Sequence, residues 1–184
     1  MSNTILTYSG IRINPTDPDI ELIRIEDIAH ALSLMTRANG HIQHFYSVAQ
    51  HTVNCCKEAS ARGYSRRVQL ACLLHDASEC YLSDITRPVK QQLPTYRAFE
   101  AVLQSMIYEV YNLSDLSDVE REQISMVDDA VLYHEFKALR DVQITSDAPV
   151  TYIDHDFSQL DFVAVENEFL ALFRELIVAP GSLL

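Results

Sequence analysis

The chain has 184 residues, of which 48% are hydrophobic and 22% are charged. This length and balance predict a single globular domain over residues 1–184 and exclude a disordered or collagen-like chain. Lys and Arg number 14 against 26 Asp and Glu, which gives a formal net charge of −12. Such an acidic chain is unlike proteins that hold nucleic acid polymers on a basic face, so phosphate must be bound locally.

The sequence indicates neither export nor membrane insertion. The first residues lack the basic segment and apolar core of a signal peptide, and the longest apolar run, residues 70–74, is too short to cross a bilayer. The cysteines form no CxxC pair, so we expect small buried hydrophobes with reduced thiols at Cys55, Cys56, Cys72 and Cys80. We therefore expect a cytoplasmic protein without membrane contact.

The first 25 residues predict a small β element. Two short apolar segments, residues 4–8 and 11–13, flank Ser9 and Gly10, which is typical of a β-hairpin. Residues 14–19 contain two prolines and several polar turn formers, which indicates a loop.

From residue 26 onward, apolar residues recur every three to four positions, which predicts helices. Ser47 with Gln50, and Ser117 with Glu120, have the spacing of capping boxes at helix starts. Residues 143–156 favour neither helix nor strand. We expect an all-α fold of about six helices, at residues 26–35, 47–61, 66–79, 95–111, 117–139 and 158–178.

Four ionisable side chains interrupt the apolar faces of three predicted helices: His51, His75, Asp76 and Asp128. A buried, unpaired carboxylate costs several kcal/mol, and one shared divalent cation would satisfy all four groups. Two imidazoles and two carboxylates suit a transition metal better than calcium, and a bound divalent ion makes water a stronger nucleophile. Each residue alone is more often a core histidine, a cap or an ion pair, but the combination favours a metal site.

Four blocks of sequence resemble the HD-domain metal-dependent phosphohydrolases, in particular their small 5′-deoxynucleotidase-like branch in bacteria and phages. The blocks are FYSVAQHT at 45–52, LLHDASE at 73–79, SDITRPVK at 83–90 and VD at 127–128. They occur in the family's order, and the similarity extends from about residue 8 to residue 135. The resemblance implies an HD-domain helical bundle.

The resemblance also implies the metal ligands, which are His51, His75, Asp76 and Asp128. Asp128 is preferred to Asp129 because the family's aspartate is commonly followed seven residues later by glutamate, here Glu135. Two-metal members carry additional histidines, and this chain has none between His75 and His134. We therefore expect one divalent transition metal ion, which is Mn, Co, Zn, Fe or Ni, with Mg as a possibility.

The resemblance further implies residues for catalysis and substrate binding. Glu79 is the expected general acid or base, and Asp84 is expected to serve catalysis or contact the sugar. Arg37, Lys90 and Arg87 are expected to bind phosphate. On residue type alone, Glu79, Arg87 and Lys90 would be solvated charges and Asp84 would be a cap.

The expected reaction is hydrolysis of the 5′-phosphate of deoxynucleoside monophosphates. Two alternatives remain open. One is a deoxynucleoside triphosphate triphosphohydrolase, acting for example on dATP, that uses the same single-metal site. The other is a metal-stabilised binding protein without turnover. The expected partners are a small-molecule nucleotide and further copies of the chain in a dimer or larger homo-oligomer.

Overall fold

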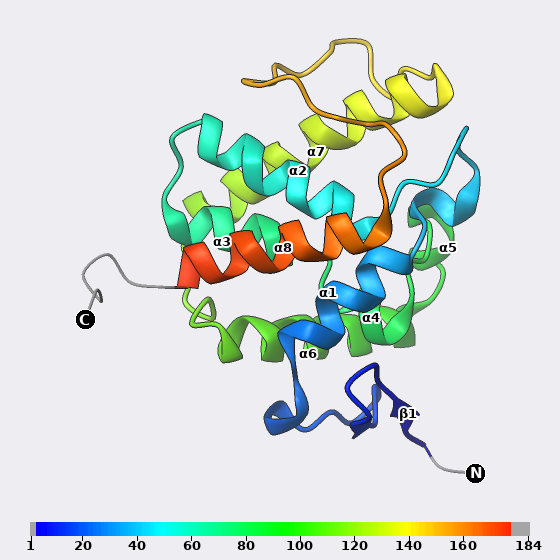
Figure 1. The fold of residues 1–184 in the computed structure, drawn as a ribbon, viewed down its shortest axis with the longest axis vertical. Helices are drawn as coiled ribbons and strands as arrows, with labels where there is room; N and C mark the ends of the chain where they lie inside the picture. The colour runs from blue at the N-terminus through cyan, green and yellow to red at the C-terminus, as the bar shows by residue number, and fades with distance from the viewer. Residues whose placement is uncertain (1–2, 178–184) are drawn as a thin grey trace.

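A computed structural model describes residues 3–177 of the chain. Most of these residues are helical, which confirms the all-α prediction (Figure 1). The helices are α1 (Ile25–Leu34), α2 (Val48–Ala61), α3 (Arg66–Leu74), α4 (Glu79–Leu82), α5 (Arg87–Lys90), α6 (Pro94–Val110), α7 (Asp118–Arg140) and α8 (Phe162–Ile177), with 3₁₀ turns η1 (Ile20–Leu22) and η2 (Arg37–Gly40).

The predicted hairpin is present as two short antiparallel strands, β1 (Ile5–Leu6) and β2 (Arg12–Ile13). Gly10 has a φ of 82°, which an L side chain rarely adopts, so glycine suits the turn between them. Ile13 is completely buried and joins the main core, which anchors the hairpin to the helices.

Serine side chains cap the starts of α2 and α7. Ser117 and Glu120 form the complete predicted capping box of α7, with both reciprocal hydrogen bonds. Ser47 accepts a hydrogen bond from the amide of Gln50, but the Gln50 side chain donates instead to the carbonyls of Asp156 and Ser158. The second predicted capping box is therefore only half formed.

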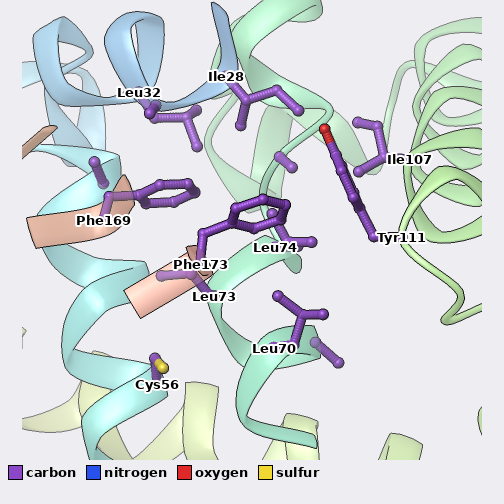
Figure 2. Close-up of a cluster of buried hydrophobic side chains, with 14 of the residues drawn as sticks. Ile28, Leu32, Cys56, Leu70, Leu73, Leu74, Ile107, Tyr111, Phe169 and Phe173 are labelled. Atoms are coloured by element: carbon purple, nitrogen blue, oxygen red, sulfur yellow. The ribbon is translucent and has the colours of Figure 1, made fainter. Parts of the chain in front are cut away.

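Helices α2 and α3 lie at the centre, between α8 on one side and α7 on the other. Figure 1 shows α8 crossing in front of α3 and α2. In the main core, Phe169 and Phe173 of α8 pack with Leu32 of α1 and Leu73 of α3 (Figure 2). A smaller cluster, containing Cys55, Cys72 and Val131, joins α2, α3 and α7. This packing fixes the three helices from which the candidate site is built.

Some predicted boundaries were wrong. The chain leaves α3 after Leu74 and passes through a turn at 75–78 before α4 begins at Glu79, so one continuous helix over 66–79 is not formed. The last helix begins at Phe162 instead of residue 158, and residue 178 lies outside the described part. Residues 143–156, which favoured neither helix nor strand, contain neither, and the whole segment 141–161 is irregular.

Three of the four cysteines are buried as the sequence predicts, and Cys80 is not. Cys55, Cys56 and Cys72 are buried, Cys80 is partly exposed, and all four are free thiols. Within residues 3–177, no helix combines the length and the apolar character needed to span a bilayer.

Candidate metal centre

Two histidines, one on α2 and one directly after α3, direct their Nε2 atoms towards a common point. His51 is completely buried on α2, and His75 directly follows α3. Their Nε2 atoms lie 3.3 Å apart. Nδ1 of His51 donates to Glu135 Oε1 at 2.6 Å, and Nδ1 of His75 donates to the carbonyl of Cys72 at 2.8 Å. Because both Nδ1 hydrogens are used, each neutral ring presents its Nε2 lone pair to the same point.

Two carboxylates complete the group. Asp128 Oδ1 lies 3.1 Å from His51 Nε2 and 3.6 Å from His75 Nε2. Asp76 Oδ2 lies 3.8 Å and 3.5 Å from the same two nitrogens. Ligand atoms bound tetrahedrally at about 2.0–2.2 Å from zinc would be separated by about 3.3–3.6 Å. The observed separations of 3.1–3.8 Å lie around this range, and the neighbouring Asp129 is exposed.

Cys55 is a further neighbour that sequence reasoning treated only as a buried hydrophobe. Its Sγ lies 3.6 Å from His51 Nε2, one turn along α2. The donor atoms of His51, Cys55, His75 and Asp128 all lie within 4.8 Å of one another, so this group could hold a metal ion. Burial, with Asp128 and Cys72 nearby, raises the pKa of the Cys55 thiol well above its usual value. Without a metal, Cys55 is therefore a neutral thiol beside the charged groups.

The group favours a positive charge at its centre. Burial alone would lower the pKa of His75, but Asp76 and Asp128 outweigh burial and raise that pKa to about 10. Burial and Arg37 act to lower the pKa of His51, but Glu135 and Asp128 outweigh them and raise it. Burial disfavours ionised Asp128, yet hydrogen bonds from both histidines hold its pKa well below the usual range. Without a metal, a proton on His75 supplies this positive charge. A bound divalent cation would replace that proton.

Glu135 holds His51 in place through its Nδ1 atom. The sequence did not identify Glu135 as a functional residue. Besides His51, it accepts a hydrogen bond from the Tyr46 hydroxyl at 2.8 Å. Arg37 lies 3.6 Å from Glu135 Oε2 and 3.2 Å from Asp76 Oδ2, so it bridges the two carboxylates. The sequence signal for Glu135 is its position four residues from both Val131 and Leu139, which places an acidic residue on the buried face of α7.

A cavity of about 510 Å³ opens beside this group. Asp76 and Asp128 line it, whereas His51 is completely buried behind them. The structure brings every predicted catalytic and substrate residue to the same cavity: Arg37, Glu79, Asp84, Arg87 and Lys90. The cavity is also lined by residues that were not predicted to be part of the site, among them Phe136 on α7.

Lys90 lies between Glu79 and Glu100 in the cavity wall. Lys90 Nζ lies 3.3 Å from Glu79 Oε1 and 2.6 Å from Glu100 Oε1 on α6. Oε2 of Glu79 is buried without a hydrogen-bond partner among the described residues. Burial, together with Asp76 and Asp84, raises the pKa of Glu79 to about 9. Glu79 is therefore protonated at neutral pH when no metal is bound.

Asp84 and Arg87 lie on the opposite wall from α7. Asp84 is half-buried, and burial raises its pKa, aided by Asp76 and opposed by Arg37 and Lys90. Arg87 is exposed at the start of α5. Asp84 thus faces the charged interior of the cavity, while Arg87 belongs to its solvent side.

Comparison with known proteins identifies relatives but no activity. No protein-family model matches the chain. It is 38% identical over 109 residues to the uncharacterized protein YfdR of Escherichia coli K12, which covers 59% of this chain and 58% of that protein. It is 45% identical over 87 residues to the uncharacterized protein RCAP_rcc00048 of Rhodobacter capsulatus, covering 45% and 44%. The match thus spans about half the length of each relative.

Proposed function

We propose that the chain is an HD-domain metal-dependent phosphohydrolase that removes the 5′-phosphate from deoxynucleoside monophosphates. One observation carries the proposal: two imidazole Nε2 atoms and two carboxylates converge beside a cavity that is also lined by arginine, lysine and a buried glutamate. The family resemblance of the same residues supports the choice of reaction.

The donor set fits one transition metal ion. His51, His75, Asp76 and Asp128 would hold it, and their mixture of nitrogen and oxygen donors suits Mn, Fe, Co, Ni or Zn. When bound, a divalent ion supplies a Lewis acid for a phosphate oxygen and acidifies water.

The chain's own residues supply the remaining functions. Arg37 and Lys90 neutralise negative charge on the phosphoryl group, which is a large part of catalysis in phosphoryl transfer. Glu79, buried in the cavity wall, would donate a proton to the 5′ oxygen as the phosphate ester bond breaks. Asp84 accepts a hydrogen bond from the sugar, and Arg87 adds positive charge towards solvent.

One observation supports the alternative of a deoxynucleoside triphosphate triphosphohydrolase. Besides Arg37 and Lys90, the exposed Arg87 and Arg140 also line the cavity. Two further phosphates would require such additional positive charge.

The assay that tests the proposal uses protein stripped of metal and then supplied with Mn, Co, Zn or Mg. Orthophosphate released from dAMP would support the proposed reaction, whereas tripolyphosphate released from dATP would support the alternative. Glu79→Gln should remove turnover and leave metal content unchanged, with Glu122→Gln on the exposed face of α7 as the matched control. Absence of any product with every metal would favour a binding protein without turnover.

We also propose that the chain self-associates. Light scattering during size-exclusion chromatography tests this, and a mass of 20.9 kDa at all protein concentrations would contradict it.

A further inference from the structure

Four cavity-lining residues follow one another along α7 at intervals of four positions: Asp128, Leu132, Phe136 and Arg140. At a rise of about 1.5 Å per residue, neighbours in this row are separated by about 6 Å along the helix. The row begins at the candidate metal centre and ends at an exposed arginine. Its chemistry changes along the way from carboxylate to aliphatic, then aromatic, then cationic.

The aromatic part of the cavity lining comes from α7 alone. The segment from Asp84 to Lys90 contributes charged and hydroxyl side chains together with the apolar Ile85 and Pro88. On α7, Leu132 and Phe136 line the cavity and are only half-buried, although neighbouring Val131 is completely buried in the core. Among the described residues lining the cavity, Phe136 is the only Phe, Tyr or Trp. A ligand that fills this cavity therefore has one aromatic ring available for stacking, and that ring is on α7.

The spacing indicates what kind of ligand would use that surface. Phe136 lies two intervals from Asp128, about 12 Å along the helix axis, and helical side chains lean back towards the N-terminus. An offset of about 12 Å is longer than a phosphate or a sugar alone, and it is of the length spanned by a metal-bound phosphate, a sugar and a base together. Inorganic phosphate would not extend to the ring, and a sugar phosphate would leave it uncovered.

We propose that Phe136, supported by Leu132, is the residue of this cavity that selects for the base of the ligand. This inference rests on the proposed function, because it places the phosphate at the metal end. The guanidinium carbon of Arg140 lies over one face of the Phe136 ring, 5.6 Å from its centroid. The base stacks against the ring face that Arg140 does not cover, and Leu132 contacts the sugar.

The test compares two ligands that share sugar and phosphate but differ in the base: dAMP and deoxyribose 5-phosphate. Binding is measured by calorimetry with Mn²⁺, in a Glu79→Gln background so that neither ligand is consumed, and kcat/KM is measured in the otherwise native chain. Loss of one base–aromatic stack weakens binding by about tenfold. Phe136→Ala should weaken dAMP binding by that factor and leave deoxyribose 5-phosphate binding unchanged.

Two further variants guard the interpretation. Phe136→Leu keeps an apolar side chain without a ring, so it should lose the preference for dAMP even if Phe136→Ala perturbs the fold. Met126→Ala removes an exposed α7 side chain outside the cavity and should change neither ligand. The inference is overturned if native protein binds the two ligands equally, or if loss of the ring affects both or neither.

These outcomes separate the subsite from the hydrolase proposal. Base-dependent binding that disappears in Phe136→Leu, without turnover of any phosphate ester, would support the subsite and contradict the hydrolase. Turnover of dAMP with an unchanged preference in Phe136→Leu would support the hydrolase and contradict the subsite.

Discussion

Helix α2 carries two completely buried ionisable side chains, His51 and Glu58, seven residues apart, and the surroundings of the two differ. Glu58 accepts hydrogen bonds from Arg62 Nε at 2.9 Å and from the amide of Tyr152 at 3.0 Å, and it pairs with His155 Nε2 at 3.1 Å. Its negative charge is balanced by residues of the protein itself. His51 instead faces the Nε2 of His75 and two carboxylates around a shared point.

The difference shows that burial of a charge does not by itself identify a functional site. Arg62, Tyr152 and His155 each bond to Glu58, and the bonds of this group connect the segment 141–161 to α2. Glu58 lines neither of the cavities beside the candidate metal centre. The His51 network has converging lone pairs and negative charges, and it borders a cavity. The first arrangement stabilises the fold, whereas the second one calls for a cation. The following changes test this distinction.

The largest expected effect follows removal of a ligand ring. His75→Ala should lower Mn²⁺ affinity by more than the about 10–100-fold that loss of an outer-shell partner causes, and should abolish turnover. Calorimetry and phosphate release measure the two effects. His30→Ala on α1, which removes a histidine paired with Glu166, serves as the control and should retain both. Full metal affinity in His75→Ala would show that the ring is not a ligand.

Glu58→Ala should have the opposite profile. Removal of one partner from a buried ion pair costs about 3–5 kcal/mol, because Arg62 and His155 would remain buried without their carboxylate. Urea denaturation should show this loss, while the folded variant should still bind one metal ion per chain. A variant with unchanged stability and lost metal binding would reverse the roles assigned to the two networks.

Glu135→Gln tests the link between a buried acid and the metal centre. The variant keeps the shape of the side chain but loses the charge that orients His51 through Nδ1. Outer-shell changes of this kind lower metal affinity or activity by about 10–100-fold. Metal titration measures the effect against Glu122→Gln on the same helix. Equal metal affinities in the two variants would show that Glu135 does not support the metal centre.

The pH dependence sharpens the comparison further. In the metal-free fold the pKa of His75 is raised from 6.5 to about 10, so the stability it contributes is full below pH 6.5 and is lost as pH rises through 10. A metal ion must displace that proton, so stabilisation by Mn²⁺ should grow over the same interval. Thermal unfolding with and without Mn²⁺ measures both trends. A metal-free Tm that rises across the interval would contradict the assignment.

The helices were predictable because each follows an apolar period, and because Ser117 and Glu120 mark the start of α7 with a local signal. The end of α3 was not predictable in the same way. After His75 and Asp76, Ala77 is again apolar and completely buried. The spacing of apolar residues therefore does not show that the chain turns at His75. A turn and a helix can bury the same residues.

The site was predictable where a polar residue interrupts an apolar face, as His51 and Asp128 do. Glu58 and Glu135 also lie on buried faces, but an acidic residue at helical spacing normally faces solvent. Their burial depends on partners from distant parts of the chain, such as His155, 97 residues after Glu58. Such long-range pairing leaves no local signal. The place of Phe136 was not predictable for a related reason, because it lines a cavity that only the assembled fold creates.

The most direct test of the central claim is anomalous diffraction from crystals grown with Mn²⁺ or Zn²⁺. The account predicts a single peak within bonding distance of Nε2 of His51, Nε2 of His75 and a carboxylate oxygen of Asp128. A fourth protein ligand at Asp76 would agree with the sequence prediction, and one at Cys55 would replace it. No peak at this position, or a metal bound elsewhere while the two rings turn apart, would contradict the account.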